Sequence, residues 1–166
     1  MESWKTISQK KIILPENLEA RIKAIKDNGY TIATINGSFD LMHAGHLYII
    51  YEASKVADIL LVAMNTDDSI RRYKRKSGRP IVPLESRMQM MTAIGFVDYV
   101  TYFDEDDPCD LLEKIKPDVH VNGEEYGSDC LEAPLVRRNG GRIHIVPRIE
   151  GLSTSEIIGK IQTVCV

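Results

Sequence analysis

Short, uninterrupted apolar runs recur along this chain, and segments with helical patterns separate them. Five such runs are expected to form strands: residues 30–36, 58–64, 97–103, 118–121 and 142–146. The runs lack the apolar–polar alternation of a sheet that faces water on one side, so each strand is expected to be buried on both faces. This pattern predicts an α/β fold, namely a Rossmann-like, doubly wound parallel five-stranded sheet in a single domain.

The intervening segments predict helices over residues 15–28, 47–57, 84–94, 108–116, 130–138 and 153–163. The first is expected to begin at Pro15, since proline suits a first helical turn, and its apolar stripe is Leu18, Ile22 and Ile25. Residues 1–13 show no firm pattern. Residues 1–29 are therefore interpreted as an N-terminal extension with one helix, packed on a domain of residues 30–166.

Composition excludes several classes of protein. The 166 residues carry a net charge of −3, so a global basic field and a nucleic-acid partner are not expected. Cys109, Cys130 and Cys165 are scattered, which predicts neither a disulfide framework nor a zinc site and favours a reducing compartment. No apolar run approaches the roughly 20 residues of a membrane helix, and the N-terminus lacks a signal-peptide pattern. A cytoplasmic protein without a membrane partner is expected.

The first predicted strand passes into a helix through a segment with two histidines, His43 and His46, around Gly45. This junction is where open α/β folds bind phosphates, because the helix start offers free N–H groups and a partial positive charge. At a spacing of three, both imidazoles fit on one side of a helical turn, and glycine lets a ligand approach the backbone. The pattern favours an anion site.

Two other interpretations of the histidines stay open. They would be ordinary polar residues near a helix start, or metal ligands, although His-x-x-His without a third ligand is a poor zinc signal. The strand is followed by neither Gly-x-Gly-x-x-Gly nor a Walker-type loop, which disfavours those modes of phosphate binding. The remaining histidines, His120 and His144, fall in predicted strands and are expected to be core or edge residues.

Two more segments contain candidate phosphate ligands. Ser153 and Glu156 form a capping box, which starts a helix and still presents N–H groups to an anion, and Thr154 adds a hydroxyl. Arg148, just upstream, carries the planar fork that suits phosphate oxygens. In the basic stretch after the second strand, most charges are expected to be solvated, and Lys74 is the candidate that reaches bound phosphates.

The segment after the fourth predicted strand, residues 121–127, is acidic and contains glycines. It is either a simple turn or a place where a carboxylate accepts hydrogen bonds from ribose hydroxyls. The glycines would let a base or sugar approach the backbone.

Taken together, these motifs resemble the cytidylyltransferase-like nucleotidyltransferase superfamily, which is marked by His-x-Gly-His after the first strand. The resemblance runs from about Thr31 to Ile161. Within the superfamily the chain is most similar to the adenylyltransferase domain of heptose-1-phosphate adenylyltransferases. That likeness lies in residues 65–69, 79–88, 103–106 and 139–141.

The resemblance implies roles for individual residues. His43, His46 and Lys74 would be catalytic, stabilising charge at the α-phosphorus and on the triphosphate. Asp40 and Asp67 would shape the site or bind the acceptor. The nucleotide-binding residues would be Gly37, Ser38, Phe39, Gly45, Arg87, Asn122, Gly123, Glu125, Arg148, Ser153 and Thr154.

The implied reaction joins a nucleoside triphosphate to a phosphorylated sugar or polyol and releases pyrophosphate, with Mg²⁺ bound to the triphosphate and no metal held by the protein alone. The leading pair is ATP and D-glycero-D-manno-heptose 1-phosphate, giving ADP-heptose for lipopolysaccharide biosynthesis. Two departures keep an alternative open. Asn122–Tyr126 stands where the heptose family has Lys-Gly-Gly-Asp-Tyr, and Pro147–Thr154 is similar to CTP-dependent glycerol-3-phosphate cytidylyltransferases.

Other classes of function also stay open. A non-catalytic nucleotide sensor would use the same pocket. The apolar segment Ile94–Val100 resembles a dimerisation surface of the family, so a homodimer is expected.

Overall fold

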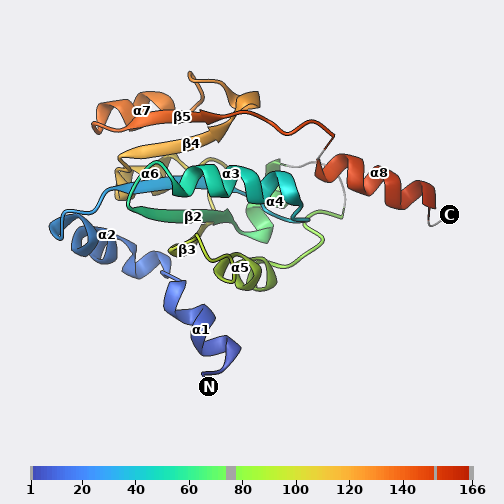
Figure 1. Cartoon of the computed structure of the whole chain (residues 1–166), viewed down its shortest axis with the longest axis horizontal. Coiled ribbons are helices and arrows are strands. Elements are labelled where there is room, and N and C mark those ends of the chain that lie inside the picture. The colour runs from blue at the N-terminus through green and yellow to red at the C-terminus, as the bar shows by residue number, and fades with distance from the viewer. Residues whose placement is uncertain (1, 74–77, 152, 165–166) are drawn as a thin grey trace.

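A parallel five-stranded sheet forms the centre of the computed structural model, which describes residues 2–73, 78–151 and 153–164 (Figure 1). The strands are β1 (Ile32–Gly37), β2 (Ile59–Asn65), β3 (Tyr99–Phe103), β4 (Val119–Gly123) and β5 (Arg142–Val146). Their order is β3-β2-β1-β4-β5. The predicted doubly wound sheet is confirmed, and its predicted strands differ from the observed ones only at their ends.

The strand order reverses between β1 and β4. Ile35 of β1 pairs with Val62 of β2 on one side and with Val121 of β4 on the other. The chain builds outward from β1 to β3, returns, and then builds outward from β4 to β5. In an open parallel sheet such a reversal leaves a crevice beyond the carboxyl ends of the two strands, because their connections leave toward opposite faces.

Helices lie on both faces of the sheet. The α-helices of the described residues are α1 (Trp4–Lys11), α2 (Leu18–Asp27), α3 (Ala44–Ser54), α4 (Asp67–Tyr73), α5 (Leu84–Thr92), α6 (Cys109–Ile115), α7 (Ala133–Arg138) and α8 (Thr154–Val164), of which α8 extends away from the sheet (Figure 1). On one face, α3 and α5 pack against apolar residues of all five strands, with Ile50 and Met91 fully buried. On the other face, α2 and α6 bury Leu18 and Ile115 against Ile32 and Leu61. Among the described residues no helix is long and apolar enough to cross a membrane.

Two helices were not predicted. We expected one helix in residues 1–29, but α1 precedes the 3-10 turn Pro15–Asn17 and α2. Its sequence gives no apolar stripe because the residue that it buries is Ser8, whose Oγ lies 2.8 Å from Thr92 Oγ1. Short α4 was hidden by its charge: Arg72, which we expected in a solvated loop, pairs with Asp106 at 2.7 Å.

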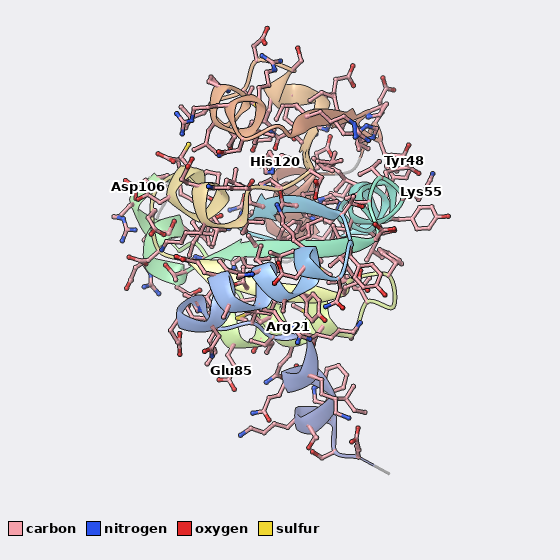
Figure 2. The ribbon with its side chains drawn as sticks, turned by 90° about the vertical axis from the view of Figure 1, so that its left-hand side faces the viewer. Arg21, Tyr48, Lys55, Glu85, Asp106 and His120 are labelled. Atoms are coloured by element: carbon pink, nitrogen blue, oxygen red, sulfur yellow. The ribbon has the colours of Figure 1, made fainter. Side chains whose placement is uncertain are left out.

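A polar pair lies inside the sheet. His120 of β4 is fully buried, and its Nδ1 lies 2.8 Å from Thr34 Oγ1 on the neighbouring strand. In Figure 2 His120 lies between the helical layers, with Tyr48 and Lys55 of α3 on one side and Asp106 on the other. Burial lowers the pKa of His120 to about 4, although the charge of Glu132 opposes this, so the ring is neutral at neutral pH.

Arg87 of α5 ties together the loops at the carboxyl edge of the sheet. Its side chain is fully buried, and its guanidinium donates to the carbonyls of Ser38 (2.6 Å), Asn65 (3.0 Å) and Val82 (2.9 Å). It also donates to Asp67 Oδ1 at 2.6 Å. The ends of β1 and β2, the start of α4 and the segment before α5 are thus held by one side chain. A buried charge persists only when it is paired and hydrogen-bonded in this way.

Replacing Arg87 is expected to lower the free energy of unfolding. Arg87→Met leaves the Asp67 carboxylate and the carbonyls without their donor, which should cost about 3–5 kcal/mol of the free energy of unfolding. Urea unfolding measures the loss. The control is Arg137→Met, which removes an arginine whose ion pair with Asp129 is exposed, and it should cost less than about 1 kcal/mol. Equal losses in the two variants would contradict the assigned role.

Candidate functional site

A cavity of about 510 Å³ opens at the carboxyl edge of the sheet, where the strand order reverses between β1 and β4. The ends of β1, β4 and β5 form its floor, and the starts of α3 and α8 form its walls. Both helices therefore direct their unpaired N–H groups and the positive ends of their dipoles toward this region. The fold thus places an anion site at the reversal point.

Most of the predicted nucleotide-binding and catalytic residues line this cavity. They are Gly37, Ser38, Phe39, His43, Gly45, His46, Asn122, Gly123, Glu125, Arg148, Ser153 and Thr154. Segments that lie more than a hundred residues apart in sequence, around His43 and Ser153, therefore meet at one site. The predicted residue Lys74 lies outside the described residues.

The two histidines of the motif form a stacked pair at the start of α3. Their ring centroids lie 4.0 Å apart with a tilt of 36°. The backbone N–H of His43 donates to His46 Nδ1 at 3.3 Å. Because Nδ1 accepts this hydrogen bond, the ring proton of His46 is on Nε2, which makes Nε2 a hydrogen-bond donor. This local hydrogen bond explains why the motif needs a spacing of three residues.

His43 is tuned by groups from the far end of the chain. Burial lowers its pKa, the charge of Arg148 lowers it further, and Glu156 of α8 partly opposes this. The ring is therefore neutral at neutral pH, and its buried Nδ1 has no hydrogen-bond partner among the described residues. A bound ligand could form a hydrogen bond with this unpaired ring nitrogen on the cavity wall.

The start of α8 is joined to the histidine loop. Ser153 Oγ accepts from the N–H of Glu156 at 3.1 Å, which is the predicted cap, and Thr154 Oγ1 donates to the carbonyl of Leu41 at 3.4 Å. Beyond this start α8 extends away from the sheet, and none of its described residues is buried (Figure 1). The helix therefore contributes its N-terminus to the site and little to the core.

Phe39 adopts a strained conformation between β1 and α3. Its φ of +42° is in the left-handed region, which costs a non-glycine residue about 1–3 kcal/mol. The ring covers Gly37, where a Cβ would lie 3.2 Å from Phe39 Cε2, and its edge meets the His46 ring at a centroid distance of 5.7 Å. The strained turn thus sets the position of the His46 ring.

The β4 side of the cavity carries the acidic segment. The Glu125 carboxylate folds back over Gly123, so that a Cβ on Gly123 would lie 2.4 Å from Glu125 Oε2. Glu124 Oε2 instead accepts from the N–H of Arg148 at 3.4 Å, which links this segment to the chain after β5. The glycine therefore has a specific use: it makes room for a carboxylate at the cavity wall.

Sequence reasoning missed several residues of the cavity, among them Asn36, Tyr126 and Ser155. Asn36 lies on β1, one register step beyond the pair Ile35–Val121, and so stands beside Asn122 of β4. Its Oδ1 is buried without a partner among the described residues. The only signal for Asn36 was a polar residue at the end of an otherwise apolar strand.

Three predicted site residues have structural roles instead of lining the cavity. Arg87, expected near the nucleoside, is the buried hub described above, and Asp67, an expected acceptor residue, is its ion-pair partner. Asp40 accepts from Arg79 Nε (2.5 Å) and from the N–H groups of Ile81 and Val82. Asp40 and Asp67 therefore shape the site, which is one of the two roles expected of them, while Arg87 is not among the residues that line the cavity. A charge in the sequence did not reveal this burial.

These contacts explain the charge of Asp40. Burial raises its pKa, but the hydrogen bonds from Val82 and Ile81 and the charge of Arg79 outweigh burial, so the pKa lies below its usual value. The carboxylate is ionised and fully engaged. Among the described residues, no group of three or more His, Cys, Asp or Glu side chains is placed to hold a metal ion.

Residues 34–160 match a family model described as cytidylyltransferase-like. Among curated proteins, the chain is similar to the bifunctional protein HldE of Syntrophotalea carbinolica (36% identical over 152 residues) and of Azotobacter vinelandii (42% identical over 149 residues). These matches cover 91% and 87% of this chain but 31% of each relative. The chain thus spans less than a third of the length of these relatives.

Solved structures show the same fold. A lipopolysaccharide core biosynthesis protein from Thermoplasma volcanium has a TM-score of 0.58 at 28% identity, over 73% of this chain and 98% of the other. Pantoate–β-alanine ligase from Francisella tularensis, complexed with β,γ-ATP and β-alanine, has a TM-score of 0.55 over 93% of this chain and 79% of the other. The latter is 15% identical and indicates the fold alone.

Gly123→Ala tests whether the Glu125 carboxylate belongs to the ligand site. The backbone φ of −72° accepts alanine, but the new Cβ displaces the carboxylate. The free energy of unfolding should change by less than about 1 kcal/mol, because a flexible side chain moves away. The Kd for a nucleoside triphosphate, measured by calorimetry, should rise about fivefold, the loss of roughly one hydrogen bond.

The matched control for that variant is Gly159→Ala on α8, where nothing lies within 4 Å of the new Cβ. This change should leave the Kd unaltered and stabilise the helix by up to about 1 kcal/mol. An unchanged Kd in Gly123→Ala would contradict the placement of the Glu125 carboxylate in the ligand site.

Proposed function

Because the chain belongs to the cytidylyltransferase-like family, we propose that it transfers a nucleotidyl group from a nucleoside triphosphate to a phosphorylated sugar or polyol, with release of pyrophosphate. One observation carries the proposal. A single cavity combines the histidine pair at the start of α3 with Arg148 and the hydroxyls at the start of α8. Two helix N-termini and an arginine suit the charge of a triphosphate.

The proposed reaction is a direct displacement. A phosphate oxygen of the acceptor forms a bond with the α-phosphorus, and the bond from that phosphorus to the oxygen that bridges to the β-phosphate breaks. Pyrophosphate leaves with the bonding electron pair. A phosphate anion is already nucleophilic, so no protein nucleophile or general base is needed. Catalysis then depends on positioning and on stabilising charge in the transition state.

The histidine pair supplies the donor for this charge. His46 Nε2 carries a proton because Nδ1 is held by the His43 N–H. A neutral donor of this kind can stabilise the oxygens around the α-phosphorus without losing its own proton. Arg148 and the α8 N-terminus would hold the far end of the triphosphate, where the leaving pyrophosphate gathers charge.

Mg²⁺ is proposed to arrive with the triphosphate. Magnesium in such sites keeps several waters and binds mainly through phosphate oxygens. The cavity fits this mode, since Glu125 is the one carboxylate among its described lining residues and no cage of carboxylates is formed there. The metal would offset phosphate charge, while the chain's own residues bind and orient the substrate.

For the substrates, we propose ATP and D-glycero-D-manno-heptose 1-phosphate, which would give ADP-heptose. The support is the similarity to HldE proteins over most of this chain and to the lipopolysaccharide core biosynthesis protein. The alternative is CTP with glycerol 3-phosphate or another polyol phosphate. It is favoured by the departure from the heptose family at Asn122–Tyr126, where Glu125 lines the cavity, and by the sequence from Pro147 to Thr154.

We also propose a homodimer in the cytoplasm. Tyr51 of α3 is exposed, and its ring meets that of Phe96 edge to face at 5.5 Å. Leu47, one turn earlier on α3, is also exposed. This apolar surface adjoins the segment Ile94–Val100 and would be covered by a second copy.

A pyrophosphate-release matrix tests the proposed reaction and substrates. ATP, CTP, GTP and UTP are each combined with heptose 1-phosphate, glycerol 3-phosphate and other sugar and polyol phosphates. We expect turnover with ATP and heptose 1-phosphate. Turnover with CTP and none with ATP would contradict the proposed substrates but not the proposed type of reaction. Nucleotide binding without release for any pair would indicate a sensor.

Removing either histidine should slow turnover without unfolding the chain. His43→Ala and His46→Ala should each lower kcat about 100-fold or more, the effect of losing one well-placed donor of ~3 kcal/mol. His144→Ala on β5, outside the cavity, is the control and should keep normal turnover.

A second pair of variants tests the His46 tautomer. His46→Gln places an N–H near the position of Nε2, whereas His46→Asn reaches only to the position of Nδ1. Glutamine should therefore retain more activity than asparagine. Near-normal turnover in both His43→Ala and His46→Ala would contradict the catalytic role assigned to the histidine pair.

A further inference from the structure

Two asparagine side chains at the cavity floor carry buried polar atoms that the fold leaves unpaired. Asn122 of β4 is 7% exposed, and Asn36 of β1 is half-buried. Asn36 Oδ1 and Asn122 Nδ2 are both buried, and neither has a hydrogen-bond partner among the described residues. A buried amide group without a partner lowers stability, and native proteins keep few of them. Because both residues line the cavity, a ligand can supply the missing partner.

The strand register places the two carboxamides side by side on one face of the sheet. Thr34 Oγ1 lies 2.8 Å from His120 Nδ1, so the side chains of these paired residues point to the same face. Asn36 and Asn122 each follow two residues later on the same strands, and side chains two residues apart share a face. It is the face that α2 and α6 cover, since Ile32 of β1 belongs to the core beneath these helices.

The proposed phosphate site and the asparagine pair therefore lie on opposite faces at the carboxyl edge of the sheet. The histidine pair begins α3, which packs on the other face, and α8 is joined to the loop before α3. A nucleotide whose phosphates lie there reaches the asparagine pair only by crossing the edge between β1 and β4. Asn36 and Asn122 directly precede Gly37 and Gly123 at this edge. The ribose is the group that follows the α-phosphate, so the ribose meets the pair first.

The two unpaired atoms are one acceptor and one donor, and a hydroxyl group offers the complementary donor and acceptor on a single atom. Neighbouring strands lie about 4.8 Å apart, and one oxygen with hydrogen bonds of about 2.8 Å on both sides spans that distance at an angle of about 120°. Since Asn36 Oδ1 and Asn122 Nδ2 have no partners, each carboxamide can turn these atoms toward the cavity without breaking a hydrogen bond that they make. The geometry thus suits a hydroxyl between the two side chains.

We propose that Asn36 and Asn122 form a specificity-determining pair that binds one ribose hydroxyl of the nucleotide. The hydroxyl donates to the oxygen of one carboxamide and accepts from the N–H of the other. The pair thereby selects ribonucleotides over deoxyribonucleotides. The inference rests on the proposed function only in taking the cavity as the nucleotide site.

The test removes the hydroxyl from the ligand and the carboxamides from the chain in turn. Calorimetry measures the Kd of the Mg²⁺ complexes of ATP, 2′-deoxy-ATP and 3′-deoxy-ATP, or of the CTP series if CTP binds more tightly. In the native chain, one deoxy form should bind about tenfold more weakly than its parent nucleotide. That penalty should fall to about threefold in Asn36→Ala and in Asn122→Ala, and to less than about twofold in the double variant. Either single variant decides the question alone if the other does not fold.

The matched control is Asn65→Ala, at the end of β2. Asn65 is 5% exposed and is not among the cavity residues, and its Nδ2 donates to Ser69 Oγ at 3.0 Å. Removing this paired carboxamide should lower the urea midpoint of the free chain and leave the deoxy penalty unchanged. Asn36→Ala and Asn122→Ala should instead keep or raise the midpoint, because each removes a buried polar atom that has no partner.

Equal binding of the parent nucleotide and both deoxy forms by the native chain would overturn the inference. So would a deoxy penalty that persists in full in the double variant. A changed ratio of the Kd values for ATP and CTP with an unaltered deoxy penalty would show that the pair contacts the base, which also contradicts it.

The failure of this inference differs from the failure of the proposed function. A native chain that binds nucleotide but releases no pyrophosphate contradicts the proposed reaction, while the deoxy penalties still test the asparagine pair. A native chain that binds no nucleotide contradicts both.

Discussion

The buried guanidinium of Arg87 is the interaction on which the site depends most. It reaches the ends of β1 and β2, the start of α4 and the segment before α5, and it closes these contacts with an ion pair to Asp67. Asp40 holds the neighbouring segment in the same manner through Arg79. The two buried pairs fix the loops at the carboxyl edge. The turn from β1 into α3 therefore has a rigid base, which the strained Phe39 requires.

The site follows from topology once that edge is held. The reversal of strand order between β1 and β4 opens the cavity, and the start of α3 brings in the histidine pair. The end of β5 then leads to α8, whose first turn is joined to the α3 loop through Thr154 and Leu41. Donors from both halves of the chain therefore converge on one region. A triphosphate is charged along its whole length and needs donors at both of its ends.

Much of this could be predicted from the sequence, for identifiable reasons. Apolar runs such as Ile59–Met64 carry their own evidence of burial, and the His43–His46 spacing sets a local hydrogen bond that does not depend on the rest of the fold. Charged residues were harder, because a charge in a sequence shows neither its burial nor its partner. Arg87 and Asp40 were therefore expected at the ligand and were found in the scaffold.

Asn36, a polar residue at the end of a strand, is the opposite case: it was expected only as part of the strand and was found in the cavity lining. Asn36 reads as the last residue of a strand, and its place beside Asn122 depends on the register of β1 and β4, which no local pattern specifies. Helix α1 escaped notice because it buries a serine and not an apolar stripe.

A crystal structure with Mg²⁺ and an α,β-methylene analogue of the preferred nucleotide tests the central claim most directly. The account predicts the α-phosphate beside His46 Nε2 and the β- and γ-phosphates between Arg148 and the start of α8. It also predicts the nucleoside on the β4 side, within reach of Asn122 and Glu125. A triphosphate bound away from both helix starts, or a nucleoside placed against Arg87 and Asp67, would contradict it.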